Sequence, residues 1–281
     1  MVRFKFSNDF KGEGISNGLD RGLLVSYKSL NLVQEGMGLG TPALKTNTRT
    51  FFSRTSKLTK LSENTYKKTF YIDSELIWDF ISLWNNNDND YQIFTALINK
   101  LTDLYKKFSK FQTNLLKLGL FSQNLIGISS RIISRGILSK IVTYYEIKKN
   151  KVIIEVDFSN VLKLNKNQFK KICILNELGG NHFNLSISNG FIYPPPSGWV
   201  SLNAKNYPSL FSEDLNLKFN VIVISITEGI AYDFVYGRES MSNFCWAGYD
   251  IEIELDSIKK PETNHSIKYL CVFDIGRRNV K

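Results

Sequence analysis

Residues 137–158 have the sequence ILSKIVTYYEIKKNKVIIEVDF, and this stretch decides the fold. In its second half Val152, Ile154 and Val156 occur at every other position, which is the period of a strand with one buried face. The polar Lys148-Lys149-Asn150 separates this run from the apolar run before it. Two such runs around a short polar segment predict a β-hairpin.

Working outward from this hairpin, the same alternation recurs on both sides, between segments rich in Gly, Asn and Pro. Asn189-Gly190 is a strong signal for a tight turn between two of these runs. About a dozen strands without alternating βαβ units predict a mainly β fold, namely one large antiparallel β-sandwich or barrel. The further expected strands are Val2–Phe6, Gly22–Tyr27, Arg49–Ser53, Tyr66–Ile72, Lys171–Asn176, Phe183–Ser188, Phe191–Tyr193, Phe219–Thr227, Ala231–Tyr236, Cys245–Leu255 and Ser266–Ile275.

The β pattern is interrupted at roughly 74–136. Apolar residues recur there at spacings of three and four, first between Leu76 and Trp84 and again between Ile93 and Phe108. This period predicts helices with one apolar face. We therefore expect an α-helical insertion at roughly 74–136 within a single β-rich domain of residues 1–281. The alternative is a second domain, in which residues 1–72 belong to a separate sheet.

Positive charge is concentrated in and beside this insertion. The chain has a formal net charge of +10, and seven cations but no Asp or Glu lie between Leu104 and Lys140. A basic segment interleaved with apolar residues can face the sheet, a second copy of the chain in a homodimer, or an anionic membrane surface. Nucleic acid is not an expected partner, because the arginines that read bases and phosphates are scattered along the chain.

Cysteine usage points to a reducing compartment. Cys173, Cys245 and Cys271 are odd in number, far apart and set in apolar runs, so we expect buried, unpaired thiols. The first residues lack the apolar core of a secretory signal, and no window approaches the ~18 apolar residues of a membrane span. These features predict a cytoplasmic protein, with peripheral contact to a membrane as the alternative.

The stretch from Glu35 to Gly40 contains three closely spaced glycines. A dinucleotide-binding loop would have to open a helix, yet Thr41-Pro42 and further β pattern follow. The spacing therefore favours a glycine-rich bend or bulge in a curved sheet. Glu35 remains a candidate site carboxylate on that bend.

The strongest candidate for chemistry is the polar segment around Glu177 and His182. A carboxylate close to a histidine can exchange a proton near neutral pH, so the two residues are candidate acid and base. The alternative is a polar turn in which His182 is simply exposed. Farther along the chain, Pro194-Pro195-Pro196 can hold an extended loop that presents Trp199 to a ligand.

A third group of candidates lies near residue 235. On a strand that starts at Ile230, Tyr232 and Tyr236 share one face, where they can line a cavity or pack in the core, and Asp233 takes the other. Arg238 follows beyond the expected strand, and either a ligand contact or a surface ion pair with its neighbour accounts for it. Trp246, like Trp199, is an expected ligand-binding aromatic residue of a loop.

No cofactor or metal is expected, because His182 and His265 are distant and no cysteine pair has ligand spacing. Three functions fit these features, and the sequence leaves open whether any of them is enzymatic. The first is a protein that binds an apolar or lipid-like small molecule, with the insertion as lid or membrane contact. The second is a carbohydrate-active enzyme or binding protein that uses Glu177, His182 and the aromatic loop residues. The third is an assembly protein that dimerises through the insertion.

Overall fold

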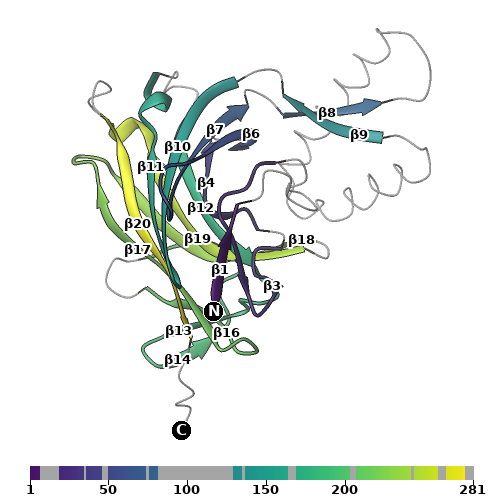
Figure 1. Ribbon diagram of the computed structural model, residues 1–281, viewed down its shortest axis with the longest axis vertical. Coiled ribbons are helices and arrows are strands. Elements are labelled where there is room, and N and C mark those ends of the chain that lie inside the picture. The colour runs from purple at the N-terminus through teal and green to yellow at the C-terminus, as the bar shows by residue number, and fades with distance from the viewer. Residues whose placement is uncertain are drawn as a thin grey trace. The chain divides into compact units, whose positions relative to one another are not determined.

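Antiparallel strands make up most of the described chain, as the alternating pattern predicts (Figure 1). This computed structural model describes residues 1–6, 19–34, 36–45, 50–73, 76–81, 129–134, 137–163, 169–202, 207–241, 244–258 and 264–275.

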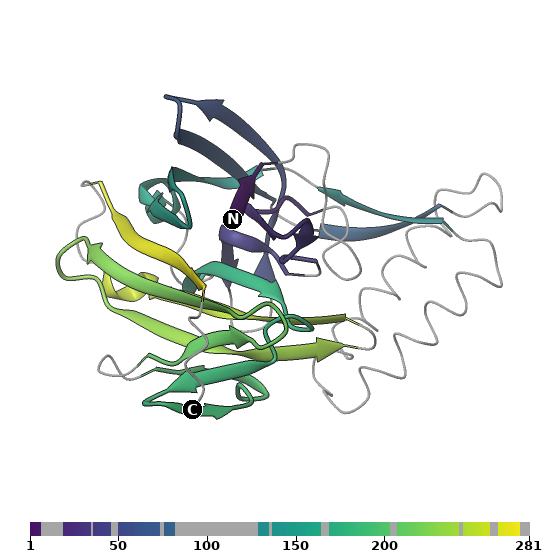
Figure 2. The same cartoon turned by 60° about the horizontal axis from the view of Figure 1, so that its bottom comes forward.

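Nine strands form the larger sheet, in the order β14-β13-β16-β17-β20-β11-β10-β7-β6. Next to its middle strand, β20, is the hairpin that the sequence predicts, with Lys148 paired to Lys151 and Lys149 at φ 41° in the turn. The last strand, yellow in Figure 1 and Figure 2, lies between β17 and β11. The strands are β6 (Ser53–Lys60), β7 (Thr65–Asp73), β10 (Ile137–Lys148), β11 (Lys151–Asp157), β13 (Leu185–Ser188), β14 (Phe191–Tyr193), β16 (Ser209–Ser212), β17 (Leu217–Ile226) and β20 (Ser266–Ile275).

Six strands form the second sheet, in the order β15-β18-β19-β12-β4-β5. They are β4 (Gly38–Lys45), β5 (Thr50–Phe51), β12 (Lys171–Gly179), β15 (Gly198–Ser201), β18 (Tyr232–Met241) and β19 (Phe244–Glu254). The pairing of β4 with β12 shifts register at Gly40, which has φ +73° and whose N–H donates to Asn176 Oδ1 at 3.1 Å. The bulge predicted for the glycine-rich stretch is therefore confirmed, and its place inside a strand rules out a loop that opens a helix.

Two smaller sheets complete the described strands. One has the order β1-β2-β3, and the other pairs β8 with β9. Two short 3-10 helices, η3 and η4, follow β11 and β19, and in the described part of the chain no helix is long and apolar enough to cross a membrane. The bounds are β1 (Val2–Lys5), β2 (Leu24–Tyr27), β3 (Leu30–Asn31), β8 (Leu76–Ile81), β9 (Ser129–Ser134), η3 (Ser159–Lys163) and η4 (Leu255–Ser257).

The chain divides into two compact units. One contains Met1–Ile72 and Leu138–Lys281, and the other contains Asp73–Ile137. The helix predicted to begin near Leu76 is wrong over Leu76–Ile81, which form β8 and pair antiparallel with β9. A run with five apolar residues in six fits a strand as well as a helix, so its periodicity could not decide. Ser129–Ser134, near the end of the predicted insertion, also form a strand, β9, so the helical prediction is wrong there too. Residues 82–128 lie outside the described residues, and the division of 1–281 into domains stays a prediction.

Three buried tyrosines tie the six-stranded sheet to the nine-stranded sheet. Tyr145 on β10 lies 3.2 Å from the carbonyl oxygens of Leu39 and Gly40. Tyr269 on β20 donates to Asn176 Oδ1 at 3.0 Å. The Tyr249 hydroxyl on β19 accepts from the N–H of Leu210 at 2.9 Å and lies 2.5 Å from the carbonyl oxygen of Pro208.

The interior between the two sheets is filled by apolar and aromatic side chains. Phe219 on β17 stacks on Phe273 at 4.8 Å between ring centroids, and Phe234 on β18 stacks on Tyr249 at 5.6 Å. All four side chains are buried in one continuous core. Two open sheets packed face to face in this way are a β-sandwich. The described strands form no closed barrel, so that alternative of the prediction is wrong.

Candidate functional site

The outer face of the six-stranded sheet is lined with acids, because acidic and apolar residues alternate along the second half of β19 and β12 adds Glu177. Ile172 and Ile174 of β12 and Ile251 and Ile253 of β19 are fully buried in the sandwich core. The residues between them point to the opposite face. The strand register sets these side chains in adjacent rows, with Leu175 beside Asp250, Cys173 beside Glu252 and Glu177 beside Gly248.

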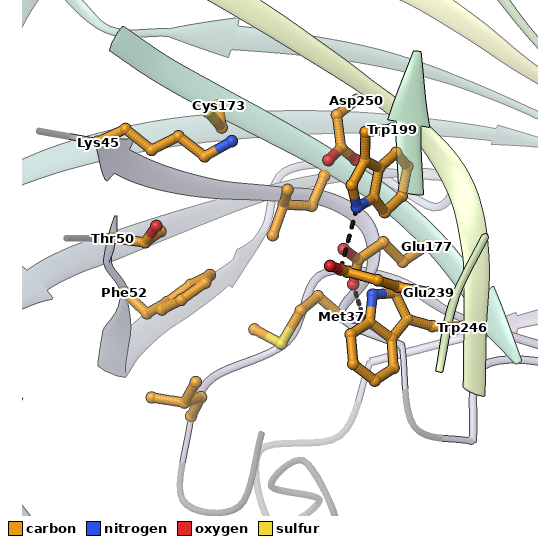
Figure 3. Close-up of a pocket in the computed structure, with 12 residues that line it drawn as sticks. Met37, Lys45, Thr50, Phe52, Cys173, Glu177, Trp199, Glu239, Trp246 and Asp250 are labelled. Carbon is orange, nitrogen blue, oxygen red and sulfur yellow. Dashed lines mark hydrogen bonds between the residues drawn. The ribbon is translucent and has the colours of Figure 1, made fainter. Parts of the chain in front are cut away.

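A cavity of about 200 Å³ opens on this face (Figure 3). Trp199, Trp246, Glu177, Glu239 and Asp250 gather at one end of it, and Lys45 with Phe52 lies at the other. Its described lining contains three carboxyl groups, two indoles, one amine and one thiol. The lining residues are Leu19, Met37, Lys45, Thr50, Phe52, Cys173, Leu175, Glu177, Trp199, Glu239, Trp246 and Asp250.

Glu177 is buried on β12 and held by the backbone that precedes β4. Its Oε2 accepts a hydrogen bond from the N–H of Met37 at 3.0 Å. Burial raises the pKa of Glu177 to about 7, and the negative charge of Glu239 adds to this effect. The hydrogen bond from Met37 and the positive charge of Arg21 act in the opposite direction and only partly offset it. Glu177 can therefore gain and lose a proton near neutral pH.

Asp250 is buried on β19, diagonally across the strand pair from Glu177. Diagonal neighbours in a sheet have Cα atoms about 7–8 Å apart, so the two side chains can act on one ligand. Burial raises the pKa of Asp250 well above its usual value, and the charge of Glu177 raises it further. Because like charges repel, the ionised form of either carboxyl group disfavours ionisation of the other. The Oδ1 of Asp250 is buried and has no hydrogen-bond partner among the described residues.

Two glycines separate Glu177 from the indole of Trp199. Across four neighbouring strands the register pairs Glu177 with Gly248, Gly248 with Gly237, and Gly237 with Trp199. Because glycine has no side chain, the sheet surface between the carboxyl group and the indole is bare. A Cβ on Gly237 would clash with the carbonyl oxygen of Gly198, so close strand packing also requires this glycine.

Both indoles at this end of the cavity are fixed by the strands that carry them. Trp199 on β15 donates its Nε1–H to Glu239 Oε2 at 3.1 Å. Trp246 on β19 is buried, with 7% of its surface exposed. The prediction that these are loop residues is wrong, since both lie on paired strands. An indole held by a strand presents a rigid apolar face to a ligand.

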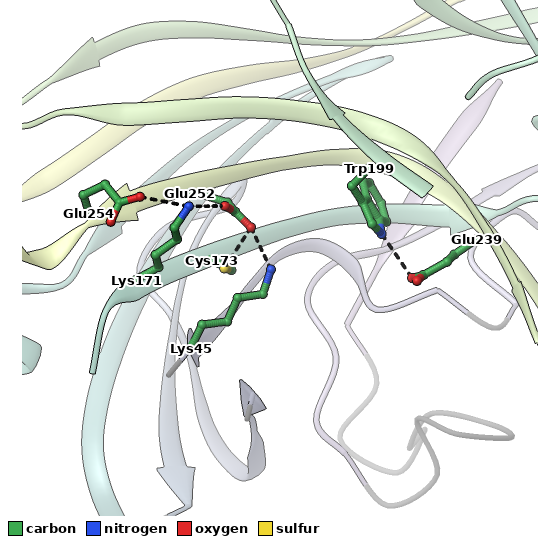
Figure 4. Close-up of polar contacts among 7 residues, drawn as sticks. All are labelled: Lys45, Lys171, Cys173, Trp199, Glu239, Glu252 and Glu254. Carbon is green, nitrogen blue, oxygen red and sulfur yellow. Dashed lines mark hydrogen bonds and ion pairs between the residues drawn. The ribbon is translucent and has the colours of Figure 1, made fainter. Parts of the chain in front are cut away.

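At the other end of the cavity, Lys45 belongs to a network of ion pairs (Figure 4). Its Nζ lies 2.7 Å from Glu252 Oε1, and Lys171 Nζ lies 2.9 Å from Glu252 Oε2 and 2.8 Å from Glu254 Oε1. Burial acts to raise the pKa of Glu252, but hydrogen bonds from Lys45 and Lys171 outweigh it and lower the pKa. Glu252 therefore stays ionised and neutralises the charge of Lys45.

Cys173 lies beside this network and is a poor candidate nucleophile. Burial raises the pKa of its thiol, so the reactive thiolate is disfavoured. As the sequence predicts, Cys173, Cys245 and Cys271 are buried and unpaired. Among the described residues no group of three or more His, Cys, Asp or Glu could hold a metal ion.

The structure brings together three of the residues that the sequence singles out, namely Glu177, Trp199 and Trp246. His182 lies in the turn that follows β12, where its N–H donates to the carbonyl oxygen of Gly179, and it does not line the cavity. The proposed acid–base pair of Glu177 and His182 therefore has no counterpart in the described hydrogen bonds. Glu35 lies outside the described residues.

The remaining candidates lie away from the cavity. Asp233 is exposed near the start of β18, on the cavity face but beside Glu252 rather than among the lining residues. Arg238 lies on the core face of the same strand, where its Nε donates to Cys245 Sγ at 3.0 Å. Tyr232 and Tyr236 also belong to that face, which places them with the sandwich core.

Three residues with a direct part in the cavity were not among the sequence-based candidates: Asp250, Glu239 and Lys45. Asp250 could have been found, because Asp250, Glu252 and Glu254 alternate with isoleucines and so must share one strand face. Lys45 depends on the pairing of β4 with β12, and Glu239 on the pairing of β18 with β19. Only the three-dimensional arrangement brings them to the cavity.

The chain matches no protein-family model, no curated protein and no solved structure. Its function is therefore argued from the geometry and chemistry of the cavity alone.

Proposed function

We propose that the cavity on the six-stranded sheet binds a carbohydrate. The observation that carries this proposal is the pair of buried carboxyl groups, Glu177 and Asp250, in one cavity with the indoles of Trp199 and Trp246. A sugar ring has apolar C–H faces that stack on indoles, and hydroxyl groups that donate to carboxylates. A concave site with aromatic walls and a few convergent polar groups is a typical ligand site.

The volume of the cavity suits one sugar ring. A cavity of about 150 Å³ holds one benzene molecule. The cavity here measures about 200 Å³, which suits a single six-membered sugar ring. A longer glycan would place its other rings outside.

The same two carboxyl groups supply what cleavage of a glycosidic bond requires. The protonated carboxyl group can give its proton to the glycosidic oxygen as the bond between that oxygen and the anomeric carbon breaks. The ionised carboxylate can take a proton from a water molecule while the oxygen of that water forms a bond to the anomeric carbon. The products are two free hydroxyl compounds, and no cofactor is consumed.

A lipid-like ligand inside the sandwich has less support. The space between the two sheets is filled by buried aromatic and aliphatic side chains. The lid that such a function would need falls mostly in residues 82–128, outside the described residues. Membrane contact and dimerisation through that segment stay predictions.

A calorimetric titration against a panel of mono- and oligosaccharides tests carbohydrate binding. We expect at least one sugar to bind, and Trp199→Ala to weaken its binding by about tenfold or more, because the indole is a rigid anchor. Phe191→Ala is the matched control: it removes an aromatic ring that is 75% exposed and does not line the cavity. Indifference of the wild-type protein to every sugar would refute the proposal.

Hydrolysis of aryl glycosides tests the acid–base chemistry. We expect turnover of at least one glycoside, and a loss of about 100-fold or more in kcat with Glu177→Gln, which cannot donate or accept the proton. Glu213→Gln, which alters an exposed carboxyl group in the turn between β16 and β17, should leave kcat unchanged. Sugar binding without any turnover would limit the function to binding.

A further inference from the structure

Acidic side chains outnumber basic ones in the cavity. Glu177, Glu239 and Asp250 line it, and Lys45 is the positively charged residue among the described lining side chains. The charge of Lys45 favours the ionised forms of Glu177 and Asp250, but its ion pair among the described residues is with Glu252, 2.7 Å from its Nζ. The carboxyl groups at the indole end therefore have no cation of their own within the lining.

The carboxyl group of Asp250 indicates which kind of ligand group the cavity accepts. It is 4% exposed, and its carboxyl group lies with Trp199, Glu177 and Glu239 at one end of the cavity (Figure 3). Its Oδ1 has no hydrogen-bond partner among the described residues. Burying a polar atom without a partner is costly, so such an atom in a cavity indicates a donor supplied by a ligand.

The charged side chains near the Asp250 carboxyl group come from several strands of the six-stranded sheet. Glu177 lies on β12, Glu239 on β18 and Glu252 on β19, and Lys45 lies on β4. Arg21 precedes β2, and its Nη2 donates to three carbonyl oxygens of the segment before β4 at 2.5–3.2 Å. Acidic side chains therefore outnumber basic ones around this carboxyl group.

We infer that the ligand of this cavity carries a protonated nitrogen, bound by Asp250 and Glu177 beneath the indoles of Trp199 and Trp246. An ammonium group donates three hydrogen bonds, which would satisfy the free oxygen of Asp250. A cation is also attracted to an indole face. The inference rests on the proposed function and specifies it further: among carbohydrates, the cavity selects amino sugars.

The experiment compares sugars that differ only in charge. Glucosamine, galactosamine and mannosamine are each titrated beside the N-acetyl form and the parent hexose, with wild-type protein and with Asp250→Asn. We expect an amine to bind at least about tenfold more tightly than both uncharged partners. In Asp250→Asn that preference should fall to about threefold or less. Glu213→Gln serves as the matched control and should keep the preference.

A second measurement does not depend on a variant. Because the raised pKa leaves Glu177 partly protonated near neutral pH, binding of a cation to its carboxylate must release a proton. The affinity for the amine should therefore rise between about pH 5.5 and pH 7.5, while the affinity for the parent hexose stays level. Calorimetry in buffers of different ionisation enthalpy counts the released protons.

The outcomes separate the inference from the proposed function. An uncharged sugar that binds as tightly as its amine, with no proton release, overturns the inference and leaves carbohydrate binding standing. Tight binding of a simple amine such as putrescine, with no sugar bound, supports the cation site and overturns carbohydrate binding. Binding of neither overturns both. If Asp250→Asn does not fold by circular dichroism, the proton release of the wild-type protein decides.

Discussion

Glu177 is held in two competing environments. Burial on β12 disfavours its charged form, whereas the N–H of Met37 and the charge of Arg21 favour it. Burial prevails, and the pKa of Glu177 rises from 4.5 to about 7. The folded protein therefore holds this proton more tightly than the unfolded chain does. This difference in proton affinity makes the free energy of unfolding depend on pH.

The stability of the Glu177→Gln variant should reveal this linkage. Below about pH 4.5 the carboxyl group is protonated in both states, and its full contribution to stability is present. As pH rises toward and through 7, the unfolded state loses its proton first, so wild-type stability falls. Glutamine cannot ionise and still accepts from Met37. The melting temperature of the variant relative to wild type should therefore rise from pH 5 to pH 8.

Thermal unfolding followed by circular dichroism measures this difference. Glu213→Gln is the control, since Glu213 is exposed and should give no such trend. A difference for Glu177→Gln that stays constant across the pH range would show that burial does not raise its proton affinity.

Tyr249 shows how a single hydroxyl joins the two sheets. Tyr249→Phe removes the acceptor of the buried Leu210 N–H and leaves that donor without its partner. We expect a loss of about 1–3 kcal/mol in the free energy of unfolding, measured by urea denaturation. Tyr144→Phe is the control: Tyr144 is half-buried on β10, where Lys67 lies over its ring, and the change should cost less than about 0.5 kcal/mol. Equal losses in both variants would contradict the bridging role.

At the scale of elements, alternation along a strand fixes which residues share a face. The pattern in β19 puts Asp250, Glu252 and Glu254 on one side and isoleucines on the other. The same period correctly predicts β10, β11 and β20 to within about two residues of their bounds. It fails for Leu76–Ile81, where almost every residue is apolar and neither period stands out.

Gly237→Ala tests whether strand packing builds the aromatic end of the cavity. The added Cβ would clash with the carbonyl oxygen of Gly198, so β15 must move away from β18 and carry Trp199 with it. We expect a loss of about 1–3 kcal/mol in the free energy of unfolding by urea denaturation, together with weaker sugar binding.

Ser240→Ala is the matched control for this variant, because Ser240 is exposed on the same strand. It should leave both stability and binding unchanged. Sugar binding that persists at full strength in folded Gly237→Ala would show that the position of Trp199 does not matter.

At the scale of the whole molecule, the sequence predicts the class of fold and only part of the site. The mainly β character follows from local alternation, and the free thiols follow from their apolar surroundings. The site joins residues from β4, β12, β15, β18 and β19, and their order in the sheet differs from their order in the chain. The pairing of β4 with β12 joins strands far apart in sequence, so Lys45 could not be assigned to the cavity in advance.

The central claim is that a carbohydrate binds in the cavity between the buried carboxyl groups and the two indoles. A crystal structure of the protein saturated with the tightest-binding sugar tests it most directly. We predict density for one sugar ring against Trp199 and Trp246, with donors of the sugar within hydrogen-bonding distance of Glu177 and Asp250. Sugar density on another surface, with an empty cavity at saturation, would contradict the account.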